Sequence, residues 1–287
     1  MRASRTTSNP VFKNLPRQET GYASFGSAAA GAGQLGYQYG NQQQYPQQYQ
    51  QPYPQAPTRS LTIDDVVTKT GITLGVLALS ALVTYLLTSA NNGLAPLFVI
   101  GGGLIGLVLV LVATFGNKAD NPALVLSYAV AEGVFVGALS FMFTDISFGG
   151  AGGAGMIGQA ILGTFGVFAG MLVVYKTGAI RVTPRFTRML IGAMIGILVL
   201  VVGNLIASFF TDGGFGLRDG GPIAIIFSLV VIAIAAFSFL LDFDAADQLI
   251  RAQAPPKAAW GVALGLTVTL VWLYVEILRL LSYFQSD

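Results

Sequence analysis

Residues 70–117 read TGITLGVLALSALVTYLLTSANNGLAPLFVIGGGLIGLVLVLVATFGN and contain no charged side chain. A helix needs about 20 apolar residues to cross a hydrocarbon core of ~30 Å, so this stretch is long enough for two spans. Asn91-Asn92-Gly93, with Pro96 following, predicts the turn between them. The same pattern of apolar segments and polar breaks continues to the C-terminus. It predicts seven spans, at about 70–90, 94–115, 122–143, 154–175, 188–210, 222–242 and 260–282.

The composition agrees with a membrane protein. Only 10% of the 287 residues are charged, whereas a soluble domain carries about 25%. The hydrophobic fraction is 54% and the mean hydropathy is +0.67. Backbone groups in lipid must be hydrogen-bonded internally, so the spans are expected to be α-helices. The fold class is therefore an all-α, seven-helix transmembrane bundle, residues 61–287.

Two missing residue types exclude much chemistry. The chain has no Cys and no His, which removes disulfides, thiolate metal sites, Ser-His catalysis and His-ligated haem. A net charge of only +2 does not favour nucleic acid as a partner. We therefore expect neither an enzyme nor a bound cofactor.

Residues 1–60 differ in kind from the rest. The stretch from Gln34 to Gln55 holds ten Gln and five Tyr among 22 residues, with Pro and Gly between them. Such a segment cannot bury enough apolar surface to offset its ordering entropy, so a disordered tail is predicted. It could dock a membrane partner, or be only a solvated extension.

The basic residues predict the orientation. With the N-terminus inside, 13 of the 15 Lys and Arg residues lie in the tail or in the loops after the second, fourth and sixth spans, and only Arg218 and Arg279 fall on the far side. Positive charge is retained on the cytoplasmic side. The sequence therefore predicts a cell-membrane protein with a cytoplasmic N-terminus and an extracytoplasmic C-terminus.

Six spans carry the G-x-x-x-G pattern, in which small residues let helix backbones approach closely. With 36 Gly in the chain, several matches are expected by chance, so the pattern is used here as a sign of tight packing within one chain, expected to be a monomer. The pairs are Gly71/Gly75, Gly102/Gly106, Gly133/Gly137, Gly166/Gly170, Gly192/Gly196 and Gly261/Gly265.

Ionisable side chains inside the spans are the functional candidates, because each costs about 2.5 kcal/mol or more to insert. Glu132 lies near the middle of the third span, with nothing charged for ten residues on either side. Glu276 and Arg279 lie in the outer half of the seventh, three residues apart on one helix face, where they could simply pair. Asp242 and Asp244 are expected at the end of the sixth span, where solvation is the plain alternative.

Glu276 has two readings. Next to another acidic side chain it could share a proton and form a pH-sensitive latch or a cation site. Alternatively it is a neutral acid hydrogen-bonded to a backbone carbonyl. Its position is about 16 residues, or ~24 Å, into the seventh span, whereas Asp244 is expected near the opposite membrane face. The two acids therefore meet only if the seventh helix begins later, near Gly265, or if the sixth helix bends inward.

Four motifs together resemble the Bax inhibitor-1 family, and its branch from high-GC Gram-positive bacteria more closely. They are Asn9-Pro10-Val11-Phe12, Tyr128-x-x-x-Glu132-Gly133-x-x-x-Gly137, Leu240-Leu241-Asp242-Phe243-Asp244 and Leu273-Tyr274-Val275-Glu276-Ile277. The resemblance covers about residues 65–284 and the short tail motif.

The resemblance implies a bundle with its last helix at the centre and a pH-sensitive calcium leak. The gate would be two acids that share a proton: Glu276, where the family usually has Asp, and Asp244 or, two residues earlier, Asp242. Asp244 and Glu276 would then offer oxygen ligands to calcium. Glu132 matches the acid of the third helix.

Two further readings belong to other classes. A non-conducting regulator could bind a membrane quality-control protease or another membrane partner through the tail. An intramembrane aspartyl protease could use two carboxylates to activate water, but the Gly-x-Gly-Asp and Tyr-Asp motifs typical of that group are missing.

Overall fold

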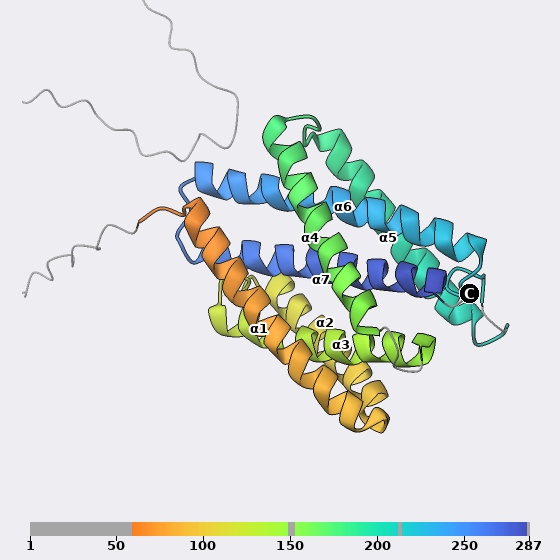
Figure 1. The fold of residues 1–287 in the computed structure, drawn as a ribbon. Helices are drawn as coiled ribbons and strands as arrows, with labels where there is room; N and C mark the ends of the chain where they lie inside the picture. The colour runs from red at the N-terminus through yellow and green to blue at the C-terminus, as the bar shows by residue number, and fades with distance from the viewer. Residues whose placement is uncertain (1–58, 149–152, 212–213, 286–287) are drawn as a thin grey trace, which may run out of the picture. The chain divides into compact units, whose positions relative to one another are not determined.

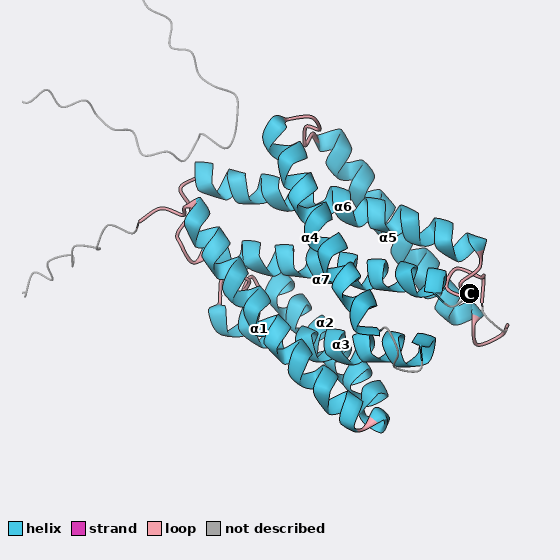
Figure 2. Cartoon of the chain, in the orientation of Figure 1, coloured by secondary structure: helices cyan, strands magenta, loops and turns pink. Residues whose placement is uncertain are grey.

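The computed structural model describes residues 59–148, 153–211 and 214–285 (Figure 1). The predicted tail therefore lies outside the described residues, apart from its last two positions, and so does the motif at Asn9. Within the described ranges all regular structure is helical, and Figure 2 shows no strand there.

Seven long helices and one short 3-10 turn make up the bundle. They are α1 (Ile63–Ala90), η2 (Asn92–Leu94), α2 (Ala95–Phe115), α3 (Pro122–Phe148), α4 (Gly153–Thr177), α5 (Pro184–Ala207), α6 (Pro222–Arg251) and α7 (Ala258–Gln285). Each of the seven is long and apolar enough to cross a membrane, which confirms the predicted fold class.

Local sequence explains where several helices begin. Thr62 caps α1 by accepting a hydrogen bond from the Asp65 amide (3.3 Å), and the Asp65 carboxylate accepts one from the Thr62 amide (3.0 Å). This reciprocal cap starts α1 at residue 63, seven residues before the predicted start. The first residues of α3, α5 and α6 are proline, whose fixed φ suits the first turn and whose missing N–H would have no partner there.

The structure corrects the end of the sixth span. We expected it to stop at 242, with Asp242 and Asp244 at its boundary, but α6 continues to Arg251. The expected end followed the loss of hydropathy, whereas helical hydrogen bonding continues through residues 243–251. Five of these are good helix formers: Ala245, Ala246, Gln248, Leu249 and Arg251. Both aspartates therefore project from a continuous helix.

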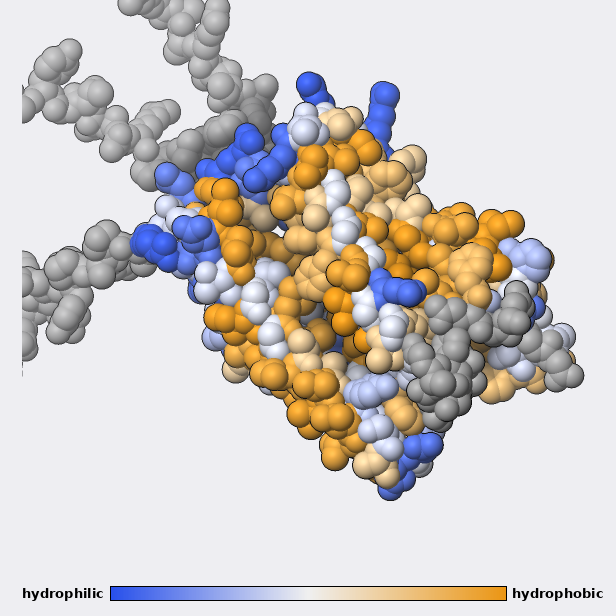
Figure 3. Space-filling model, viewed as in Figure 1, coloured by the Kyte–Doolittle hydropathy of each residue, from blue (hydrophilic) through white to orange (hydrophobic). Residues whose placement is uncertain are grey.

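The last helix is the most buried span, as expected. In an 18-residue apolar stretch of each helix, the buried share is 61% for α7, 56% for α3 and 39% for α6. It is only 11–22% for the other four helices. α7 packs against α1, α3, α4 and α6, while α2 packs mainly on α3, and α5 on α6. The outer helices expose many large apolar side chains, the surface that lipid would cover (Figure 3).

Basic side chains gather at one end of the bundle, which we call the basic end. Hydrophilic residues are concentrated there in Figure 3, near the start of α1 and the α4–α5 turn. Because successive helices run in opposite directions, the start of α1 and the α2–α3, α4–α5 and α6–α7 connections all lie at this end. Their basic residues include Arg59, Lys118, Arg181, Arg251 and Lys257.

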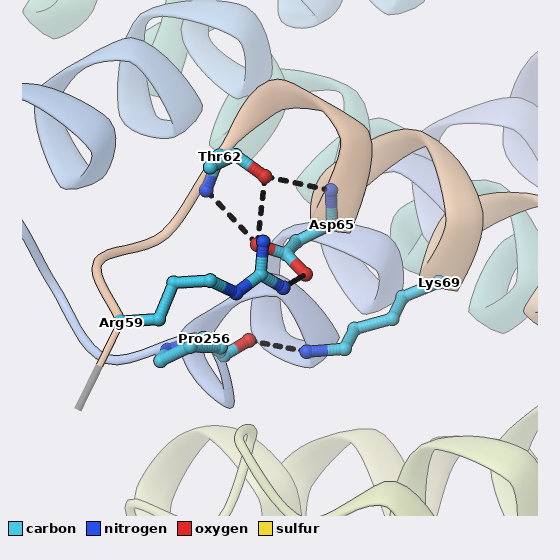
Figure 4. Close-up of polar contacts among 5 residues, drawn as sticks. All are labelled: Arg59, Thr62, Asp65, Lys69 and Pro256. Carbon is cyan, nitrogen blue, oxygen red and sulfur yellow. Dashed lines mark hydrogen bonds and ion pairs between the residues drawn. The ribbon is translucent and has the colours of Figure 1, made fainter. Parts of the chain in front are cut away.

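At the basic end the start of α1 is tied to the α6–α7 turn, residues 252–257. The Leu61 amide donates to the Ala254 carbonyl (2.8 Å), and the Lys69 ammonium donates to the Pro256 carbonyl (Figure 4). Lys257 in this turn forms an ion pair with Asp120 of the α2–α3 connection (2.6 Å). Through these contacts the segment at residues 59–61 is coupled to the joint between the two helices that carry most of the candidate site.

Candidate functional site

Side-chain hydrogen bonds of two acidic residues cross the seam between α6 and α7. These helices are joined by the short α6–α7 turn, so they run antiparallel, and residues at similar distances from the turn face each other. α7 supplies Thr269 and Glu276, and α6 supplies Asp242 and Ser228 as their partners.

Asp242 is a carboxylate held across this seam without a basic partner. Its Oδ2 accepts a hydrogen bond from the Thr269 hydroxyl at 2.7 Å. A Cβ at Gly265 would lie 3.5 Å from the other carboxylate oxygen, so α7 offers a smooth backbone surface there. Among the described residues no Lys or Arg lies within ion-pair distance of Asp242. A partly buried carboxylate of this kind can bind a proton or a hard cation.

Glu276 is neutralised within its own helix. Arg279 donates to its Oε2 at 2.5 Å, and the Ser228 hydroxyl of α6 donates to Oε1 at 2.8 Å. The two charged side chains are only 4% and 13% exposed, for Glu276 and Arg279 respectively. The alternative in which these residues simply pair is therefore the arrangement found.

Asp244 belongs to a polar recess at the basic end, between α6 and the α4–α5 connection. It accepts a hydrogen bond from Gln248 at 2.6 Å, and Asp247 beside it pairs with Arg251 at 2.8 Å. The recess has a volume of about 310 Å³, and Tyr175 and Arg181 also line it. Asp244 is thus in contact with polar groups, while Asp242, two residues earlier, faces α7.

Glu132 lies apart from this seam. Its carboxylate packs against Gly106 of α2, where a Cβ would come within 2.6 Å of Oε2 and 3.9 Å of the Tyr128 ring. An alanine at 106 would fit only if the Glu132 carboxylate moved aside. Glu132 serves the contact between α2 and α3.

The structure does not bring Asp242 or Asp244 against Glu276. The α6 partner of Glu276 is Ser228, which precedes Asp242 by 14 residues, or about 21 Å along the helix. α7 begins at Ala258, before the start near Gly265 that pairing required. The calcium site expected from Asp244 and Glu276 is therefore not assembled, and no group of three or more acidic residues in the described ranges is arranged to hold a metal ion.

Sequence reasoning missed the two hydroxyl partners, Ser228 and Thr269. Polar residues within an apolar span often bond across helices. The spans hold many Ser and Thr residues, however, and most of their hydroxyls bond to their own helix backbone, as Thr73, Thr164 and Thr267 do. Only the antiparallel register of α6 and α7 distinguishes Ser228 and Thr269 from these.

Comparison with known proteins gives the family. The sequence profile described as Bax inhibitor 1 like matches residues 9–286, nearly the whole chain. The chain belongs to the Bax inhibitor 1 like family. A search of the curated proteins finds no match to this chain. The profile match confirms the family resemblance inferred from the four motifs, and this Bax inhibitor 1 like chain is a multi-pass membrane protein.

Proposed function

We propose that this Bax inhibitor 1 like protein is a pH-sensitive cation leak of the cell membrane, with calcium as the permeant ion. One observation carries the proposal: the Asp242 carboxylate lies in the α6–α7 seam and, in the described part of the chain, has only Thr269 as its hydrogen-bond partner. A charge that deep in an apolar bundle is costly and is retained where it meets an ion or a proton.

The basic end provides the entrance in this proposal. The recess beside Asp244 begins two residues along α6 from Asp242. Among the described residues Asp244 forms no ion pair and is the carboxylate available there, whereas Asp247 already pairs with Arg251. Carboxylate and hydroxyl oxygens are suitable ligands for a hard cation such as calcium. The concentration of Lys and Arg at this end supports its assignment to the cytoplasm, with the C-terminus outside.

Asp242 acts as the gate. When ionised it offers a negative ligand to a cation that enters the seam. When protonated it loses that charge, and the smooth face at Gly265 allows α6 and α7 to close against each other. The protonated form is therefore the closed one, and the leak decreases as the pH falls.

The Glu276–Arg279 pair closes the other end of the seam. A paired carboxylate does not attract a second cation, so conduction requires that this pair separates or that ions pass beside it. In this proposal Glu276 stabilises the closed outer end through its ion pair, and Asp242 is the residue whose protonation controls the leak.

Calcium flux into liposomes containing the purified full chain tests the proposal, between about pH 6 and 8, the range in which a gating carboxylate must change charge. We expect a leak that rises with pH in the native protein and no pH response in Asp242→Asn. Asp64→Asn is the matched control, because Asp64 is an exposed carboxylate on α1. A pH response retained in Asp242→Asn would refute the gate, and no flux above empty liposomes would refute the channel.

A second candidate function is a non-conducting membrane regulator, which binds a membrane protein such as a quality-control protease through its tail. The neutralised Glu276 favours it, because a closed outer end suits a protein that conducts nothing. The contact of Leu61 with the α6–α7 turn, and that of Lys69 with Pro256 in Figure 4, supply a route from the tail to the bundle. Deletion of residues 1–58 separates the two functions, since a leak survives it and partner binding does not.

A further inference from the structure

A cavity of about 410 Å³ lies between α5, α6 and α7. Its wall is mostly apolar and includes Met194 and Leu198 of α5, Phe227 of α6 and Trp272 of α7. Glu276 and Arg218, from the α5–α6 connection, also line it. The volume is within the range of about 300–1,000 Å³ typical of ligand pockets.

The charged groups near this cavity differ in whether they form an ion pair. Arg218 lies close enough to Arg279 and Glu276 to interact with both electrostatically. Glu276 already pairs with Arg279. Within the described ranges, no carboxylate lies within ion-pair distance of Arg218. Asp219, which follows Arg218, acts electrostatically on Tyr283 together with Glu276 and both arginines, so the local charges are balanced in number. The fork of Arg218, which lines the cavity without an ion-pair partner among the described residues, is the group that can bind an anion.

The depth of the arginines suits a lipid headgroup. α7 has 28 residues, or about 42 Å, so it extends roughly 6 Å beyond each side of a hydrocarbon core of ~30 Å. Arg279 lies six residues before the end of α7, or ~9 Å, which places its backbone just inside the core boundary. Its long side chain can reach the level of the phosphates.

We propose that this cavity is a binding site for an anionic phospholipid. The phosphate is held by Arg218, and one acyl chain enters the apolar part of the cavity. Charge complementarity selects the occupant: a zwitterionic lipid brings its own positive charge and gains less from Arg218. The inference is independent of the proposed leak, because it concerns the end of the bundle away from Asp242.

The chain contains a reporter for this site. It has two tryptophans, of which Trp272 lines the cavity and Trp260 lies at the start of α7. The tryptophan fluorescence of a Trp260→Phe protein thus comes only from the cavity. We would reconstitute it in phosphatidylcholine bilayers containing dibrominated phosphatidylglycerol, dibrominated phosphatidylcholine or dibromostearic acid, and measure quenching of Trp272.

We expect brominated phosphatidylglycerol to quench at a lower mole fraction than brominated phosphatidylcholine. The expected preference is about fivefold, which corresponds to ~1 kcal/mol for one arginine next to an anionic lipid. Arg218→Gln should abolish the preference. Arg185→Gln should keep it, because Arg185 is an exposed residue at the other end of α5. Helicity and unfolding midpoint, measured for each variant, establish that it is folded.

Three results would overturn the site. Equal quenching by the two phospholipids, or a preference unchanged in Arg218→Gln, would mean that the arginines do not select a headgroup. A preference for dibromostearic acid alone would assign the cavity to a free fatty acid and exclude a phospholipid.

Discussion

Replacing Gly137 by alanine tests the packing of the bundle at its tightest crossing. A Cβ at 137 would lie 2.2 Å from the Ala81 carbonyl oxygen and 2.9 Å from the Ala81 Cα, both backbone atoms of α1. Ordinary contact begins at 3.4 Å, so α1 and α3 must separate by about 1.2 Å at this point. Overpacking of this kind costs about 1–3 kcal/mol. Since Ala also favours a helix by about 1 kcal/mol, the net loss is expected near the middle of that range or below.

Gly75→Ala is the matched control. Gly75 lies within α1, the helix that Gly137 of α3 packs against, and it also belongs to a G-x-x-x-G pattern, but no described atom lies within 4 Å of a Cβ built there. Both variants gain the same helix propensity, so the difference between them isolates the packing cost, about 1–3 kcal/mol. The assay is reversible unfolding in mixed detergent micelles, followed by tryptophan fluorescence. A Gly137→Ala protein as stable as Gly75→Ala would refute the α1–α3 packing described here.

Three further predictions follow from single contacts. Glu276→Gln leaves Arg279 buried without its countercharge, so the free energy of unfolding should fall by about 3 kcal/mol. Adding Arg279→Met to this variant should restore part of the lost stability. An unchanged free energy of unfolding in Glu276→Gln would contradict a buried ion pair. The hydrogen bond and charge of Lys257 lower the pKa of the Asp120 carboxyl, so this pair stabilises the fold above the ordinary Asp pKa of about 3.9 and stops doing so as the pH falls through the lowered value. Asp120→Asn should accordingly lower the thermal midpoint at neutral pH but not near pH ~2, and a pH-independent difference would argue against the ion pair. Lys69→Met should speed hydrogen exchange in the α6–α7 turn, measured by mass spectrometry, and unchanged exchange there would show that this lysine does not anchor the turn.

Most helix positions could be predicted from the sequence, because spans are defined by local properties. Charged and glycine-rich breaks mark the ends of apolar segments, and proline marks three of the starts. The errors are systematic: hydropathy reports the part of a helix that lies in lipid, whereas the helix itself ends where its hydrogen bonding ends. α1 and α6 extend beyond their apolar parts by seven and nine residues at the basic end for this reason.

The candidate site could be predicted only as a set of residues. Asp242, Asp244, Glu276, Glu132 and Arg279 stand out because charge is rare inside the spans. Their partners depend on which helices touch and in which register, and those properties belong to pairs of helices. The contact of Glu276 with Ser228, 48 positions away, has no signal in the local sequence.

The six glycine patterns show the same division. In sequence they are equivalent, but in the structure Gly102/Gly106 and Gly133/Gly137 lie at close crossings, Gly261/Gly265 make ordinary contacts, and the other three pairs meet no described atom within 4 Å. Close approach requires small residues on one helix and a backbone or compact side chain of a second helix opposite them.

The sequence by itself therefore determined the membrane class, the seven spans, their order and the family, since each depends on local composition or on motifs read along the chain. The tertiary structure decided which acids remain unpaired, which glycines are needed, and where an apolar cavity meets Arg218. Those features depend on the packing of helices distant in sequence, where van der Waals contact and hydrogen bonding across the seams select one register.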